Sequence, residues 1–442
     1  MTSSPDHAAT PGAAGETLAA PGPDERPGDV TSTPLTPDQR RNIRMLGVEM
    51  AVFVMALGAL GQLTIIPLFV SRLTDSPLAV GAVTAAFQLG WMPPVFVAGY
   101  VERSARKWPW VLWVTPFERL TAPVLMGCAL LAPTAGAAIL PLVFLACFMQ
   151  TFLGGLALTP WLDVIARVVP GRLRGRFMGT WNMVGALLGA GAAALAAPLL
   201  DWYPFPYGFA ACFGLAGLIF AVGLIPTFLV REPPGPPPRP PRPFRAQLAE
   251  LPEVLIGDPP FRRFVLGLSC AALAAMSSGF LVVYGVRELG APDELAGWYT
   301  ATLFVAQMGA SMALGWLGDR HGFTAVGKAV AIVTVGLGLV ALVAPDPYWL
   351  LLAFVGQGAV SSGSMLARLT GPIDFAPPER RPSYIALSAA LVGPCGAVAP
   401  ILGGQIVETL GYPALFGASA ALAVLAVPLL GGKPGAARYV AT

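Results

Sequence analysis

Two charged residues, Glu118 and Arg119, stand side by side within an apolar stretch of the chain. A charge in the middle of a bilayer costs about 2.5–3.5 kcal/mol on insertion scales, so such residues usually have a function. Neighbouring residues on a helix do not face each other, and each therefore needs a partner on another helix. Glu118 is a candidate proton-binding carboxylate. The alternative is a structural buried pair in which Glu118 or Arg119 meets Glu49 or Arg368.

Other kinds of chemistry have few residues available. The only histidines are His7 and His321, and the five cysteines are single residues inside apolar runs, which is typical of reduced, buried thiols. The chain has no phosphate-binding G-x-x-x-x-G-K-[ST] sequence. We therefore expect no enzymatic activity, no metal and no cofactor.

The composition is that of a membrane protein. The 442 residues are 55% hydrophobic and 12% charged, with a mean hydropathy of +0.68, whereas about a quarter of the residues of a soluble domain are charged. A membrane span needs roughly 20 apolar residues and must be helical. Twelve segments meet this requirement: residues 46–70, 78–101, 109–132, 136–160, 177–200, 207–230, 263–286, 295–318, 325–344, 348–371, 383–407 and 411–431.

The basic residues predict the orientation. If both termini are cytoplasmic, Arg72 and Arg287 are the only basic residues in loops on the opposite side, and Arg119 and Arg368 lie within spans. All the others fall on the cytoplasmic side, as the positive-inside rule requires. The preference for Arg over Lys indicates a GC-rich bacterial genome, which favours a multi-pass protein of the bacterial cytoplasmic (plasma) membrane.

A proline-rich segment divides the spans six plus six. We expect a disordered cytoplasmic tail over 1–40, one six-helix bundle over 41–231 and a second over 263–432. The linker 232–262 contains a stiff polyproline run and then a short amphipathic helix, and 433–442 is a cytoplasmic tail.

Two loops at corresponding places carry related sequences. Residues 315–322 read GWLGDRHG and match G-x-L-x-D-R-x-G, and residues 98–107 look like a degenerate copy. The chain resembles the major facilitator superfamily over about residues 41–432. The resemblance implies an all-α membrane protein with twelve transmembrane helices in two pseudo-symmetric six-helix bundles.

Charged residues at the cytoplasmic helix ends are candidates for a gate between the bundles. Asp163 and Arg167 are four residues apart and can pair on one helix face, and Pro170 to Arg174 continues a pattern found in the same family. The alternative is that these charges only enforce topology. The candidate gate residues are Glu102, Arg103, Asp163, Arg167, Arg174, Asp319, Arg320, Asp374 and Arg381.

Polar residues inside the spans are candidates for a central cavity. Gln62, Gln150 and Gln357 fall in spans one, four and ten, which line the cavity in the family that the chain resembles. The full candidate set for solute contact and coupling is Glu118, Arg119, Gln62, Gln88, Gln150, Asn182, Gln307, Gln357, Ser361 and Arg368.

The resemblance and the lack of catalytic residues favour secondary transport of a small organic solute by alternating access, in a protein that is a monomer. Its partners are then the solute and the lipid bilayer, with protons as one option for coupling and with no nucleic acid. The mainly neutral cavity candidates favour export over import. A non-transporting membrane sensor or assembly protein is the alternative, because the degenerate loop 98–107 is compatible with a gate that does not move.

Overall fold

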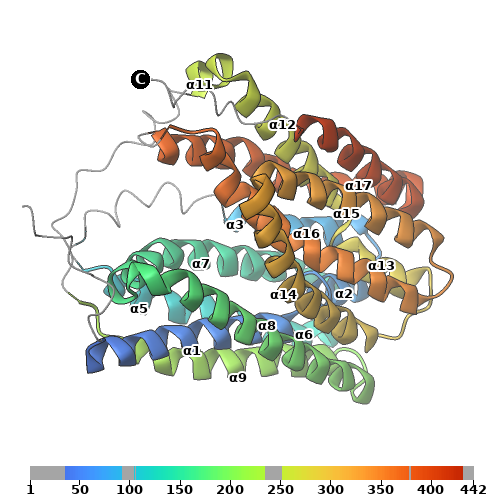
Figure 1. Ribbon diagram of the computed structural model, residues 1–442. Helices are drawn as coiled ribbons and strands as arrows, with labels where there is room; N and C mark the ends of the chain where they lie inside the picture. The colour runs from blue at the N-terminus through green and yellow to red at the C-terminus, as the bar shows by residue number, and fades with distance from the viewer. Residues whose placement is uncertain (1–34, 92–103, 105, 234–250, 378–379, 432–442) are drawn as a thin grey trace, which may run out of the picture.

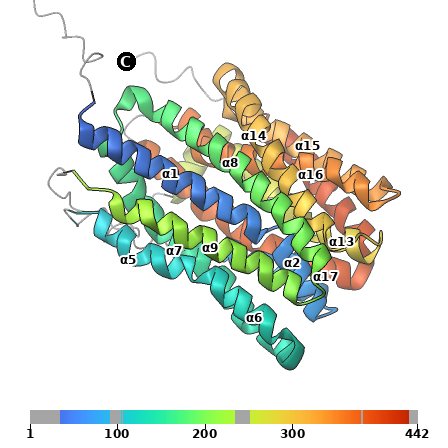
Figure 2. The ribbon, with the colours of Figure 1, turned by 90° about the horizontal axis from the view of Figure 1, so that it is seen from below.

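The structure is a computed structural model that describes residues 35–91, 104, 106–233, 251–377 and 380–431. Within these ranges all regular structure is helical. Figures 1 and 2 show long helices that run side by side in two groups. We call the group α1–α9 the N half and the group α11–α17 the C half.

The N half runs from the first described helix to the start of the proline-rich segment. Its core consists largely of aliphatic side chains and phenylalanines such as Phe69, Phe213 and Phe220. The elements are α1 (Pro37–Leu60), α2 (Ile65–Leu73), α3 (Pro77–Gly90), α5 (Trp108–Arg119), α6 (Thr121–Ala135), the 3₁₀ turn η1 (Gly136–Ile139), α7 (Leu140–Val168), α8 (Gly171–Trp202) and α9 (Tyr207–Leu229).

The C half begins with a short helix at the end of the linker. This helix, α11, overlaps the segment for which an amphipathic helix is predicted, although residues 244–250 of that prediction lie outside the described part. The elements are α11 (Leu251–Gly257), α12 (Pro259–Ala274), η2 (Ala275–Ser277), α13 (Phe280–Arg287), α14 (Leu295–His321), α15 (Phe323–Val343), η3 (Pro347–Trp349), α16 (Leu350–Thr370), η4 (Gly371–Asp374) and α17 (Arg381–Leu429).

The described residues contain nine helical stretches that are long and apolar enough to cross a membrane. One of them, Trp108–Val168, has 61 residues and would be about 90 Å long if straight, three times the thickness of the hydrocarbon layer. Its direction changes at Gly136, with φ +52°, and α17 bends at Gly411, with φ +82°. Because α3 is described only to Gly90, the number of twelve spans stays a prediction.

Three of the predicted spans are interrupted near their middle. The first breaks over 61–64, between α1 and α2, where Gly61 has φ +56°. The seventh breaks over 275–279, between α12 and α13. The third breaks at Leu120, because Pro123 has no N–H to bond the Arg119 carbonyl. Such breaks are where membrane transport proteins commonly place polar groups.

Several helices are longer than their predicted spans. α7 continues to Val168, α8 begins at Gly171 and α14 continues to His321. Hydropathy indicates only the part of a helix that lies in lipid, whereas the helix itself continues into the polar region. Asp163 and Asp319 consequently lie on helices rather than in loops.

The two halves meet mainly at one end of the molecule. We call the end with the start of α1 and α5 and the end of α7 the basic end, and the opposite end the far end. Near the far end α3 packs on α17 so closely that a Cβ added to Gly81 would lie 2.2 Å from the backbone oxygen of Pro400. In the same region α8 packs closely on α14. A Cβ on Gly297 would lie 2.6 Å from the Ala197 nitrogen. In Figure 1 the ribbons of the halves diverge toward the basic end.

Candidate functional site

A buried charged cluster lies inside the N half, where α1, α5 and α7 meet. The Arg119 Nη2 and the Glu49 Oε1 are 2.8 Å apart, and the two side chains are only 3% and 9% exposed. The indole Nε1 of Trp161 donates a hydrogen bond to the other carboxylate oxygen of Glu49, at 2.9 Å. Arg119 therefore forms the predicted structural pair with Glu49, whereas no ion pair joins Glu118 to Arg368 in the described part of the chain.

The guanidinium of Arg119 has an unusual environment. Its centre lies 5.1 Å from the ring centroid of Phe53 and 5.2 Å from that of Phe220. Aromatic faces stabilise a desolvated cation, but the Nε and Nη1 atoms of Arg119 have no hydrogen-bond partner among the described residues. One carboxylate and two rings thus hold this cation.

Glu118 lies next to this cluster without a direct partner in the described part of the chain. It is 4% exposed, and it approaches α7 so closely that a Cβ on Gly154 would lie 2.7 Å from its Oε1. The cluster contains two carboxyl groups and one guanidinium. Because an uncompensated buried charge is costly, this arrangement is suited to binding one proton.

A second polar site lies at the break in the first span. Gln62, which follows the end of α1, donates a hydrogen bond of 2.7 Å from Nε2 to the Oε1 of Gln150 in α7. Two residues on, the hydroxyl groups of Thr64 and Thr300 are hydrogen-bonded, and this bond joins the N half to the C half. The structure therefore brings together two of the predicted lining residues close to the contact between the halves.

The other predicted lining residues are spread over several helices, and no hydrogen bond or ion pair links them to one another in the described ranges. Asn182 is exposed on α8, whereas Gln357 is buried on α16. Gln88 lies near α17, since a Cβ on Gly396 would be 3.7 Å from its Nε2. The half-buried members of the set are Gln88, Gln307, Ser361 and Arg368.

At the far end, two arginines connect the halves. Arg72, in the last turn of α2, places its Nη2 2.5 Å from the Oδ1 of Asp293 in the C half. Arg287, in the last turn of α13, places its Nη2 3.4 Å from the Oδ1 of Asp75 in the N half. The guanidinium of Arg287 also donates hydrogen bonds to three backbone carbonyls, those of Ser71 at 2.9 Å, Thr74 at 2.9 Å and Asp75 at 3.0 Å.

These two connections are reciprocal. In each half an arginine lies in the last turn of the helix after the break, and a proline follows five residues later, Pro77 after Arg72 and Pro292 after Arg287. The sequence singles out both arginines by the side of the membrane on which they lie, but it assigns them no partner. Pairing across the halves depends on tertiary packing, which no local pattern reports.

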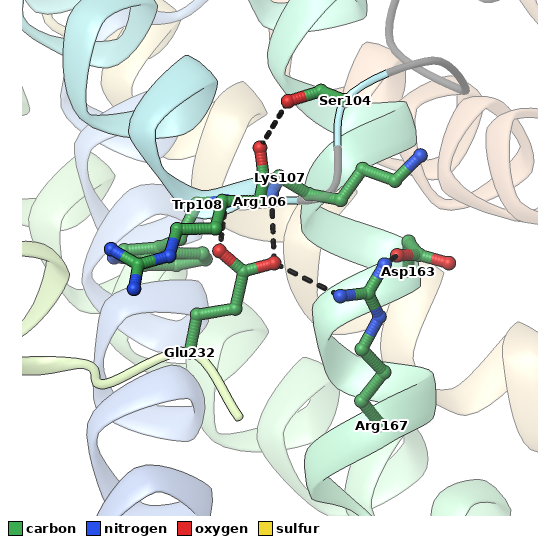
Figure 3. A network of polar contacts seen from close by, with 7 residues as sticks. All are labelled: Ser104, Arg106, Lys107, Trp108, Asp163, Arg167 and Glu232. Atoms are coloured by element: carbon green, nitrogen blue, oxygen red, sulfur yellow. Dashed lines mark hydrogen bonds and ion pairs between the residues drawn. The ribbon is translucent and has the colours of Figure 1, made fainter. Parts of the chain in front are cut away.

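At the basic end, a polar network centres on Glu232, which is not among the site residues predicted from the sequence. The Oε1 of Glu232 accepts hydrogen bonds from the backbone N of Lys107 at 2.7 Å and from the Nη1 of Arg167 at 3.0 Å, and its Oε2 accepts one from the backbone N of Trp108 at 3.0 Å (Figure 3). Glu232 thereby caps α5 and links it to α7. Its position between the sixth span and the proline run is the signal that could have identified it.

Arg167 is shared between this network and Asp163. The predicted pair of Asp163 and Arg167 is present as an ion pair four residues apart on α7 (Figure 3). The neighbouring Arg174 donates a hydrogen bond to the Ala166 carbonyl at 2.8 Å and so links α8 to the end of α7. These contacts all stay within the N half.

The candidate gate residues of the C half also bind within their own half. The Oδ2 of Asp374 accepts a hydrogen bond of 2.9 Å from the backbone N of Phe323, and the guanidinium of Arg320 lies 4.5 Å from the Trp316 ring centroid. Asp319 and Arg381 are exposed. Glu102 and Arg103 lie outside the described residues. No ion pair between two described residues joins the halves at the basic end.

Apolar helices, interrupted spans and two halves that meet at one end define a multi-pass α-helical membrane protein of the transporter type. The family model described as Major Facilitator Superfamily matches residues 48–286 and 264–438. The chain belongs to the Major Facilitator Superfamily. No match is found among curated proteins.

Solved structures share this fold. A nucleoside transporter, solved as a point mutant, has a TM-score of 0.68 at 12% identity, covering 89% of this chain and 98% of that one. A bacterial homologue of the iron transporter ferroportin in the inward-facing state has 0.63 at 17% identity, covering 88% and 98%. The xylose transporter from E. coli, in a partially occluded inward-open conformation, has 0.63 at 12% identity, covering 88% and 98%. These identities show the fold alone.

Proposed function

We propose that the protein exports a small organic solute across the bacterial plasma membrane by alternating access, in exchange for protons. One observation carries the proposal: Arg72 and Arg287 join the halves at the far end, whereas the ribbons of the halves diverge toward the basic end (Figure 1). Secondary transporters of this kind open to one side at a time as their halves rock about a central site.

The predicted orientation of the chain in the membrane indicates which side each end of the molecule faces. If both termini are cytoplasmic, as the basic residues predict, the basic end faces the cytoplasm and the arrangement corresponds to a state that is closed to the outside. Two of the similar solved structures are described as inward-facing and inward-open, which supports the same interpretation here. The candidate gate residues at the basic end would then pair across the halves only in the opposite state.

Glu118 is the proposed coupling residue. Arg119 already binds Glu49 at 2.8 Å, which leaves Glu118 as a buried carboxyl group without its own counter-charge among the described residues. Protonation removes the desolvation cost of this group, so its proton occupancy is sensitive to the rearrangement of the helices around it. An inward proton flow through this cluster would drive solute outward.

The proposed solute contacts lie at the break in the first span. Gln62 and Gln150 form a neutral hydrogen-bonded pair there, and Thr64 and Thr300 close the contact between the halves directly beside it. A neutral amide pair provides donors and acceptors without a fixed charge. This favours an uncharged or amphipathic solute over a strongly charged one.

The proposal is tested in liposomes that contain the purified protein and an imposed proton gradient, with a panel of labelled organic solutes. We expect accumulation of at least one solute that a protonophore abolishes. The Glu118→Gln variant should lose this accumulation and retain solute counterflow. If well-folded protein shows no gradient-dependent flux of any solute, the transport proposal is wrong and a sensor or assembly role takes its place. If Glu118→Gln still accumulates solute, Glu118 is structural.

A further inference from the structure

A pocket at the far end has no role in the proposed pathway. Its volume is about 800 Å³, and its walls come from both halves. The loop between α2 and α3 contributes Asp75, the end of α13 contributes Tyr284 and Glu288, and the bend of α17 contributes Glu408 and Tyr412. Any occupant would therefore touch the N half and the C half at once.

The uncommitted charge in this pocket is negative. Arg287 lines it too, but its guanidinium is bound to Asp75 and to the backbone carbonyls of the α2–α3 loop. Glu288 and Glu408 are exposed and form no ion pair with a described residue. Two carboxylates are thus available to an occupant, and Arg287, the only cationic residue among the described residues that line the pocket, is already bound.

Tyr412 supplies a second, independent feature of a binding site. It is only 6% exposed, and its ring packs against Tyr284 with a centroid distance of 5.4 Å. Its side chain lines the pocket, and its hydroxyl has no hydrogen-bond partner among the described residues. Although the residue is largely buried, this oxygen is not fully enclosed, so it can bond to a ligand in the pocket.

We infer that this pocket binds an organic cation with two amino groups and that binding holds the far end closed. Two ammonium groups would pair with Glu288 and Glu408, and one of them would also donate a hydrogen bond to the Tyr412 hydroxyl. The alkyl chain between them would lie against the rings of Tyr284 and Tyr412. Because the walls belong to both halves, the pocket exists only while the halves are together at this end. A ligand bound there shifts the population toward that state.

Binding is tested by titration calorimetry on the full-length protein in detergent, with 1,5-diaminopentane as the probe. The uncharged 1,5-pentanediol has the same length and should not bind. We expect saturable diamine binding that weakens about tenfold in Glu408→Gln, Glu288→Gln or Tyr412→Phe, because each loses one charge-assisted contact. The control variant Asp201→Asn changes an exposed acid of the far end outside the pocket and should leave binding unchanged.

Closure of the far end is measured separately, by labelling the substituted cysteine of Ala301→Cys in a variant that lacks the five native cysteines. Ala301 is buried where α14 packs on α8, between the halves. The diamine should slow its labelling by a thiol reagent several-fold, and the diol should not. Absence of saturable binding, or binding that the three pocket variants do not weaken, overturns the site. Binding with unchanged labelling overturns the closure. Neither readout requires transport, so both can fail or succeed independently of the proposed function.

Discussion

Arg72 and Asp293 are joined across the two halves, with 2.5 Å between the Nη2 and the Oδ1. Arg287 makes the converse connection, from the C half to Asp75 and the carbonyls around it. The side chain of Arg72 is 42% exposed, so its pair alone contributes no more than about 1 kcal/mol. Arg287 contributes more, because three backbone carbonyls are bound to it as well.

Removal of both arginines should open the far end. In Arg72→Ala/Arg287→Ala, we expect the equilibrium to shift by about 2 kcal/mol in total, which is more than a tenfold change in population. A cysteine at Ala301 should then react faster with a thiol reagent by a similar factor. Arg176→Ala, an exposed arginine at the basic end, is the matched control and should not change the rate. An unchanged rate in the double variant would show that packing alone closes this end.

Glu49 should be important for stability through its pair with Arg119. Glu49→Gln removes the carboxylate that binds the buried guanidinium and leaves only Glu118, which forms no ion pair with it, so we expect a loss of about 3–5 kcal/mol of stability. The measurement is unfolding of the purified protein in detergent. The double variant Glu49→Leu/Arg119→Met removes both charges and should recover most of the loss. A double variant as unstable as the single one would contradict the argument.

Glu232 should stabilise the basic end of the N half. Glu232→Ala removes the acceptor of two backbone N–H groups and of Arg167, and we expect a loss of about 2–3 kcal/mol. Glu232→Gln keeps an acceptor but removes the charge and should lose about half as much. Unfolding in detergent measures both, with Asp201→Asn as the control. Equal stability of Glu232→Ala and the unchanged protein would show that the network contributes nothing.

Gln62 and Gln150 should act together in solute binding. Gln150→Leu leaves the Gln62 amide without its partner, and we expect an increase in KM of about tenfold for the transported solute. Gln62→Leu should have a similar effect, and the double variant should be less than additive because the two amides form one pair. The control is Gln405→Leu, because Gln405 is an exposed glutamine on α17 outside the set of candidate lining residues. Additive effects of Gln62→Leu and Gln150→Leu would contradict the pair.

Features set by local sequence could be predicted. The helical fold follows from long apolar runs, and the ion pair between Asp163 and Arg167 follows from their spacing. The family follows from the loop signatures. Helix ends were less well predicted, because α8 begins at Gly171 and not near 177: its first turns are polar, and hydropathy cannot detect them.

Features that depend on how the helices pack could not be predicted. The sequence indicates that Glu118 and Arg119 each need a partner, but it does not show that Arg119 binds Glu49 while Glu118 forms no ion pair with Arg368 on α16. It places Arg72 and Arg287 on one side of the membrane but gives no sign that each reaches the opposite half. Glu232 was assigned to the linker because an acid beside a proline run looks solvated, whereas its carboxylate in fact caps α5.

Distances between spin labels at the two ends test the central claim most directly. One pair replaces Asp201 and Pro345 at the far end, and the other replaces Arg176 and His321 at the basic end; each pair has one label in either half. When Arg72→Ala/Arg287→Ala is introduced, the account predicts that the far-end distance increases while the basic-end distance decreases. Two distances that both stay unchanged, or that change in the same direction, would contradict alternation between the halves.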